Sequence, residues 1–132
     1  ADYEIILIDP RDHFATKNRF PNCKIINEWP DEALSKFNLD KSSHLVTLTH
    51  DPKIDDLALI FCMKKNIGYI GSLGSKKTHN KRCERLIEKG FNEIELSKIH
   101  APIGLDIKAK TPAEIAASIL AEIINYRRNN HD

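Results

Sequence analysis

The segment 71–79, Gly-Ser-Leu-Gly-Ser-Lys-Lys-Thr-His, combines residue types that hold an anion. Glycines let a backbone approach a ligand closely, and free N–H groups at a helix start attract negative charge. Lys76 and Lys77 fall in the first turn of a predicted helix, where cations oppose the helix dipole unless an acidic group docks between them. The spacing is not that of a Walker A loop. We expect either an anion site or a solvated basic helix face, and the candidate ligand residues are Gly71, Ser72, Gly74, Ser75, Lys76 and Lys77.

A second polar loop, residues 9–13, follows the aliphatic run Ile5–Ile8. An acidic residue at the end of a Rossmann-type strand commonly hydrogen-bonds a ribose diol, and Asp9 has that position. Arg11 has the chemistry to hold a phosphate. In the alternative interpretation, Asp9 caps a turn and Arg11 pairs with Asp12.

A third polar loop contains Thr49, His50 and Asp51, with Asp55 and Asp56 just beyond. Such side chains at a strand end can bind a ligand, move a proton or hold a metal-bound water. A metal is the weaker interpretation, because no second histidine lies at helical spacing. The structural alternative makes Asp51 a helix cap and His50 a hydrogen-bonded loop residue. A fourth loop, His100–Asp106, either lines a pocket or packs the chain into the last helix.

Short apolar runs alternate with helical patterns along the whole chain. Strands are predicted at 5–8, 24–27, 44–49, 67–70 and 100–104. Helices are predicted from Pro30, over 54–62, over 75–89 with Gly90 as cap, at 92–99, and from the Thr111-Pro112 start. The last helix is expected to turn Ile115, Ala116, Ile119, Leu120, Ile123 and Ile124 inward. This order predicts one α/β domain over 1–132, a parallel sheet with flanking helices that binds ligands beyond the carboxyl ends of its strands.

Composition excludes several classes of protein. The chain has 132 residues and a formal net charge of +1, which argues against a dedicated nucleic-acid binder. No apolar run approaches the roughly 20 residues that span a bilayer. No secretory signal pattern is present, and the three cysteines form no C-x-x-C pair. We therefore expect a cytoplasmic protein with reduced thiols and neither a disulfide framework nor a structural zinc.

Four segments read together resemble one family. They are IDPRDHFATKNRFP (8–21), LTHDPKIDDLAL (48–59), YIGSLGSKKTHNKRCERL (69–86) and IHAPIGLDIKAKTPAEIAASILAEII (99–124). They are similar to the carboxyl-terminal Rossmann-like domain of the xanthine dehydrogenase accessory factors, the XdhC/CoxI family. The resemblance runs from about residue 4 to residue 127.

The resemblance implies an accessory, chaperone-like role rather than catalysis. Family members bind the molybdenum cofactor (molybdopterin), help it receive a sulfido ligand from a cysteine desulfurase, and deliver it to apo molybdenum hydroxylases of the xanthine dehydrogenase type. For such a ligand, we expect the 71–77 loop to hold the phosphate and the Asp9 and His50 loops to hydrogen-bond the pterin.

The sequence departs from this family at its start. Full members carry a separate amino-terminal domain, together with the first strand and glycine turn of the Rossmann unit. That strand would lie between the strands 5–8 and 44–49. We expect the gap to be closed by direct pairing of its neighbours, by exchange between protomers in a homodimer, or by a segment outside these residues.

Two other functions remain open from the sequence. An NAD(P)-binding oxidoreductase domain would use much the same loops, although the glycine fingerprint is absent and no catalytic Tyr/Lys or Cys/His pair can be assigned. A pure interaction module would dock on the molybdenum enzyme without binding a small molecule.

Overall fold

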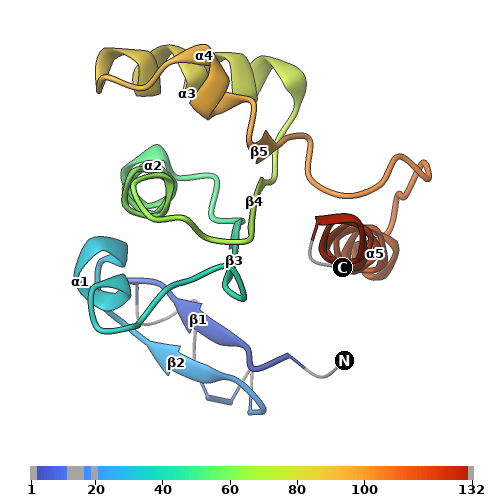
Figure 1. Ribbon diagram of the computed structural model, residues 1–132. Coiled ribbons are helices and arrows are strands. Elements are labelled where there is room, and N and C mark those ends of the chain that lie inside the picture. The colour runs from blue at the N-terminus through green and yellow to red at the C-terminus, as the bar shows by residue number, and fades with distance from the viewer. Residues whose placement is uncertain (1–2, 12–16, 19–20, 131–132) are drawn as a thin grey trace.

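The computed structural model describes residues 3–11, 17–18 and 21–130. Strands and helices alternate as expected, and Figure 1 shows helices on both sides of a parallel sheet. The elements are β1 (Ile6–Ile8), β2 (Lys24–Ile26), α1 (Pro30–Leu34), β3 (His44–Thr47), α2 (Pro52–Met63), β4 (Tyr69–Ser72), α3 (Lys76–Glu88), α4 (Glu93–Leu96), β5 (Ile99–His100) and α5 (Pro112–Asn130). The α/β class with parallel strands is confirmed.

The strands form two separate parallel sheets. In one, β1 pairs with β2, with Leu7 opposite Ile25. In the other, β4 lies between β3 and β5, with Leu45 opposite Ile70 and Ile70 opposite Ile99. Helices α2 and α5 cover opposite faces of this second sheet (Figure 1). All five strands run parallel to their partners, so their carboxyl ends can share one edge.

No ladder joins β1 to β3 within the described residues. This break falls where the expected gap was placed, and it shows that direct pairing of the neighbours does not close it. Side-chain contacts connect the β1–β2 sheet and the residues before it to the second sheet and to α5 instead. The Tyr3 ring meets the His44 ring edge-on at 5.7 Å between centroids, and Arg127 of α5 donates to the Tyr3 hydroxyl at 2.8 Å.

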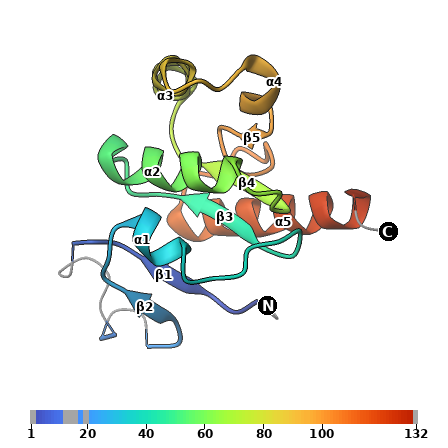
Figure 2. The ribbon, with the colours of Figure 1, turned by 60° about the vertical axis from the view of Figure 1, so that its left-hand side comes forward.

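The core lies where α2 and α3 pack on the second sheet (Figure 2). Leu59, Cys62 and Leu86 are at most 1% exposed, and Ile70 of β4 packs with them. Apolar spacing in the sequence marks Cys62 as part of the inward face of α2, but it does not single out Leu59 or Leu86. The core holds the carboxyl ends of β3 and β4 in fixed positions.

The predicted starts of α4 and α5 are confirmed, whereas α2 begins at Pro52 rather than at residue 54. Asn92 and Glu95 form a complete capping box at α4. At α5, Thr111 Oγ1 accepts the Glu114 N–H at 3.1 Å, and Glu114 Oε1 accepts the Thr111 N–H at 3.0 Å. Local hydrogen bonds set these termini, so local sequence predicts them well.

Several structural expectations were wrong in detail; β3 ends at Thr47 rather than at residue 49, and α4 ends at Leu96 rather than at residue 99. Strand β4 extends through Gly71 to Ser72, and β5 covers Ile99–His100 rather than 100–104. On α5, Ile115, Ile119 and Ile123 are half-buried, but Ala116, Leu120 and Ile124 are exposed. Each of these three residues directly follows a half-buried isoleucine, so together they lie on the next face of the helix, which is exposed.

All three cysteines are free thiols. Cys62 is buried in the core, and burial raises the pKa of its thiol to about 12. Cys23 and Cys83 are half-buried. Cys62 is therefore a packing residue of the core. Cys83 lies within hydrogen-bond distance of a histidine.

Candidate functional site

Three predicted loops meet the sheet at the carboxyl ends of β1, β3 and β4. Asp9 and Arg11 follow β1, Thr49–Asp51 follow β3, and Leu73–Ser75 follow β4. Charge interactions link the loop after β1 to the segment after β3, because Asp51 and Asp55 both favour the protonated guanidinium of Arg11. The structure thus brings the sequence-predicted residues to one edge of the molecule.

The Asp9 carboxylate is already bonded within its own loop. Arg11 Nε donates to Asp9 Oδ1 and Arg11 Nη2 to Asp9 Oδ2, both at 3.0 Å, and the Arg11 N–H donates to Oδ1 at 2.9 Å. This bond to Asp9 is the main cause that raises the pKa of Arg11. Asp9 therefore caps the turn, as in the structural alternative. The suggested pairing of Arg11 with Asp12 lies outside the described residues.

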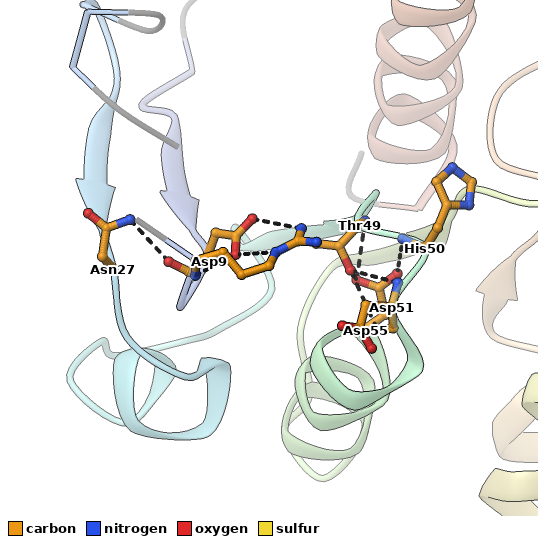
Figure 3. Close-up of polar contacts among 7 residues, drawn as sticks. Asp9, Asn27, Thr49, His50, Asp51 and Asp55 are labelled. Carbon is orange, nitrogen blue, oxygen red and sulfur yellow. Dashed lines mark hydrogen bonds and ion pairs between the residues drawn. The ribbon is translucent and has the colours of Figure 1, made fainter. Parts of the chain in front are cut away.

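The loop after β3 is organised by the buried carboxylate of Asp55, which is 4% exposed. Its Oδ1 accepts the Thr49 hydroxyl at 2.7 Å, and its Oδ2 accepts the His50 N–H at 3.1 Å. Asp51 is the N-cap of α2 and accepts the Lys53 N–H at 3.0 Å. Figure 3 shows the His50 imidazole pointing away from Asp9 and Asp55. The cap predicted for Asp51 is confirmed, while His50 is left exposed.

The loop after β4 is shorter than expected, because Gly71 and Ser72 belong to the strand. Ser72 is fully buried, and its hydroxyl lies 2.6 Å from that of Thr47 on β3. A Cβ at Gly71 would lie 2.5 Å from Ile103, so this glycine serves close packing. The Ser72 side chain therefore bonds within the sheet, and the loop itself begins at Leu73.

Helix α3 begins with exposed cations. Ser75 is its N-cap and accepts the Thr78 N–H at 3.1 Å, while Lys76 and Lys77 are exposed in the first turn. The remaining first-turn N–H groups have no partner inside the helix. Gly74 has φ +138, a conformation that a side chain would strain, and it brings the backbone close to Thr78. These groups suit a phosphate-sized anion.

Arg82 lies beneath this loop and was not singled out as a site residue from the sequence. It is 3% exposed, and its Nη2 donates to the Leu73 carbonyl at 3.1 Å. Burial lowers the pKa of Arg82, while the charges of Asp55 and Asp56 act against that lowering. Its Nε has no hydrogen-bond partner among the described residues. Arg82 therefore places a buried guanidinium directly beneath the loop that precedes the exposed Lys76 and Lys77.

A histidine–cysteine contact accompanies Arg82. Arg82 Nη1 lies 3.1 Å from His79 Nδ1, and His79 Nε2 lies 3.4 Å from Cys83 Sγ. Because a guanidinium only donates, His79 Nδ1 accepts and Nε2 carries the proton toward sulfur. Burial lowers the pKa of His79 and raises that of Cys83. This pair is therefore not arranged as a base and an activated nucleophile.

The fourth predicted loop packs the last helix onto the sheet, and its first residue, His100, also borders a hollow. The His100 ring stacks on Tyr69 at 4.6 Å and meets Tyr126 edge-on at 5.3 Å. Glu122 Oε1 accepts the Tyr69 hydroxyl at 2.5 Å and the Gly104 N–H at 3.1 Å. These contacts hold α5 against the second sheet.

Two hollows lie at the opposite edge of the strands. One, of about 460 Å³, borders Tyr3–Ile5 and Pro21–Ile25, and the other, of about 360 Å³, borders Asn66–Gly68, Ser97–Lys98 and His100. In the described ranges, no group of three or more metal-binding side chains occurs. No helix there is long and apolar enough to cross a membrane.

Comparisons with known proteins agree with this architecture. The chain is 33% identical over 127 residues to a probable xanthine dehydrogenase subunit of Bacillus subtilis, covering 96% of this chain and 36% of that protein. It is 30% identical over 100 residues to the molybdenum cofactor insertion chaperone PaoD of Escherichia coli, covering 76% and 31%. The chain thus spans about a third of the length of these relatives.

A solved structure shares the fold. A crystal structure of a xanthine dehydrogenase from Bacillus halodurans superposes with a TM-score of 0.78 at 32% identity, covering 96% of this chain and 36% of that one. Residues 1–123 match the model of the XdhC Rossmann domain. With the sequence, the solved neighbour and the strand arrangement in agreement, this chain belongs to the XdhC Rossmann domain family.

Proposed function

We propose that this domain binds the molybdenum cofactor and works as a non-catalytic maturation factor for molybdenum hydroxylases of the xanthine dehydrogenase type. The observation that carries the proposal is the similarity to the insertion chaperone PaoD over 76% of the chain. The sulfur would come from a cysteine desulfurase, and the loaded cofactor would pass to the apo hydroxylase. Exchange of a strand between protomers, or a segment outside the described residues, would complete the sheet between β1 and β3.

The chemistry of the carboxyl edge fits this ligand. Molybdopterin carries a phosphate and a pterin ring with hydrogen-bonding edges. Lys76, Lys77 and the first-turn amides of α3 would hold the phosphate, with Gly74 allowing close approach. His50 and the polar groups around Asp51 would bond the pterin. When bound, the cofactor supplies the molybdenum chemistry, whereas these side chains bind and orient it.

Reversing the two loop charges should weaken cofactor binding. We expect the variant Lys76→Glu/Lys77→Glu to bind molybdopterin at least about tenfold more weakly, since a hydrogen bond to a charged group contributes about 1.5–3 kcal/mol. The measurement is titration of the isolated cofactor, followed by pterin fluorescence and molybdenum content of the protein.

The matched control is Lys64→Glu/Lys65→Glu, which makes the same charge change on exposed residues at the far end of α2. It should bind as tightly as wild type. Equal binding by both charge-reversed variants would contradict the assignment of the phosphate to the 73–77 segment. Titrations with NAD and NADPH test the other candidate, and saturable binding tighter than roughly 100 μM would favour a nucleotide domain.

A further inference from the structure

The buried carboxylate of Asp55 lies at the centre of the three candidate loops. It accepts hydrogen bonds from the Thr49 hydroxyl, the Thr49 N–H and the His50 N–H, at 2.7, 3.3 and 3.1 Å. Its charge also acts on Arg11 after β1 and on Arg82 beneath the loop after β4. Asp55 therefore bonds directly to the loop after β3. It interacts electrostatically with one arginine beside each of the other two loops.

These hydrogen bonds hold His50 in an unusual backbone conformation. His50 has φ +63, and Lys108 (φ +58) is the other non-glycine residue of the described chain with a positive φ. The left-handed region is unfavourable for a residue with a Cβ, and such strain persists only where the surroundings hold it in place. Asp55 provides that hold, and the result is an exposed imidazole at the carboxyl edge (Figure 3).

A cap alone does not require this arrangement. Asp51 already caps α2 by accepting the Lys53 N–H, and Asp55 adds bonds to residues that precede the cap. The next residue, Asp56, does not bond to the loop. It forms an ion pair with Arg85 of α3 at 2.7 Å instead. The two adjacent carboxylates therefore serve different purposes.

We infer that Asp55 is the positioning residue of the cofactor site, and that it holds His50 in the left-handed conformation so that the imidazole meets the bound ligand. This inference rests on the proposed function and explains how the His50 side of the proposed cofactor site is held in place. His50 touches the ligand, whereas Asp55 acts through His50 and the neighbouring arginines.

The direction in which one substitution changes cofactor affinity distinguishes a positioning role from a purely electrostatic one. Asp55→Asn removes a negative charge from an edge that binds an anion, so electrostatics alone would tighten molybdopterin binding. Positioning predicts the reverse, a loss of about tenfold, which is the lower end of what loss of an orienting partner costs a metal-ligating histidine. Asp56→Asn changes the charge equally, one residue away, and should bind as wild type or slightly more tightly.

A second pair of variants separates positioning from stability. Glycine adopts a positive φ without strain, so His50→Gly and Lys108→Gly should both raise the unfolding midpoint. Only His50→Gly should lose cofactor affinity, by about tenfold. This pair remains informative even where Asp55→Asn fails to fold, because both glycine variants are expected to be at least as stable as wild type.

The outcomes are read against wild-type uptake of isolated molybdopterin. If wild type binds and either a folded Asp55→Asn variant or His50→Gly binds as tightly, the inference is overturned while the proposed function stands. If wild type takes up no cofactor, the proposed function fails and the inference fails with it. Weaker binding by both Asp55→Asn and His50→Gly, with unchanged binding by Lys108→Gly and Asp56→Asn, supports the inference.

Discussion

Replacing Leu59 with alanine is expected to lower the free energy of unfolding by about 2–5 kcal/mol. Leu59 lies on α2 with no exposed surface, at the centre of the cluster formed with Cys62, Ile70 and Leu86. The substitution removes buried methyl groups and leaves a cavity that the surrounding helices and strands fill only in part. Urea unfolding followed by circular dichroism measures the loss.

A matched substitution outside the core shows that the effect comes from burial. Ile94 of α4 is 75% exposed, so Ile94→Ala should change stability by no more than about 0.5 kcal/mol. If Leu59→Ala were as mild as Ile94→Ala, the packing of α2 on the second sheet would be wrong. The positions of Thr49, His50 and Asp55 depend on that packing.

The second large effect is expected at Gly68, which directly precedes β4. A Cβ built there would collide with the carbonyl oxygen of Lys41, a backbone atom that cannot rotate away. Gly68→Ala should therefore force the turn at Lys41–Ser43 away from the start of β4. We expect a loss of about 1–3 kcal/mol, the usual cost of overpacking, seen as a lower unfolding midpoint.

Gly90→Ala provides the comparison for Gly68→Ala. No atom lies within 4 Å of a Cβ at Gly90, but its φ is +99. Its cost is conformational strain without crowding, about 1–2 kcal/mol. Larger side chains distinguish the two positions further, because serine at Gly68 adds to the collision whereas serine at Gly90 adds none. A Gly68→Ala variant as stable as wild type would refute the close approach of the Lys41 turn.

Sequence patterns predicted the parts of the fold that local interactions determine. The start of α4 depends on Asn92 and Glu95, and that of α5 on Thr111 and Glu114, which bond within one turn. The inward face of α5 was predicted less well. Apolar periodicity marks Leu120 and Ile124 as core residues, but burial also needs a partner surface, and the described residues place none over them.

The site was predicted at the level of loops rather than of contacts. The rule for parallel sheets predicts that the loops after β1, β3 and β4 lie at one edge, as the structure has them, because it depends only on strand direction. That rule does not predict which partners Asp9, Ser72 and Asp55 bond. Asp9 bonds Arg11, Ser72 bonds Thr47 across the sheet, and Asp55 reaches back to the loop before its own helix. Such contacts depend on register and side-chain direction, which residue type and spacing alone do not determine.

The most direct test of cofactor binding at the carboxyl edge is to locate the bound cofactor on the wild-type chain. Backbone amide chemical shifts recorded while isolated molybdopterin is added would show which residues respond. We expect saturable shifts at Thr49–Asp51 and Leu73–Lys77, on the edge that holds Asp55 and Arg82. Shifts confined to the opposite edge, at Asn66–Gly68 and Ser97–His100, or no saturable shifts at all, would contradict the proposed site.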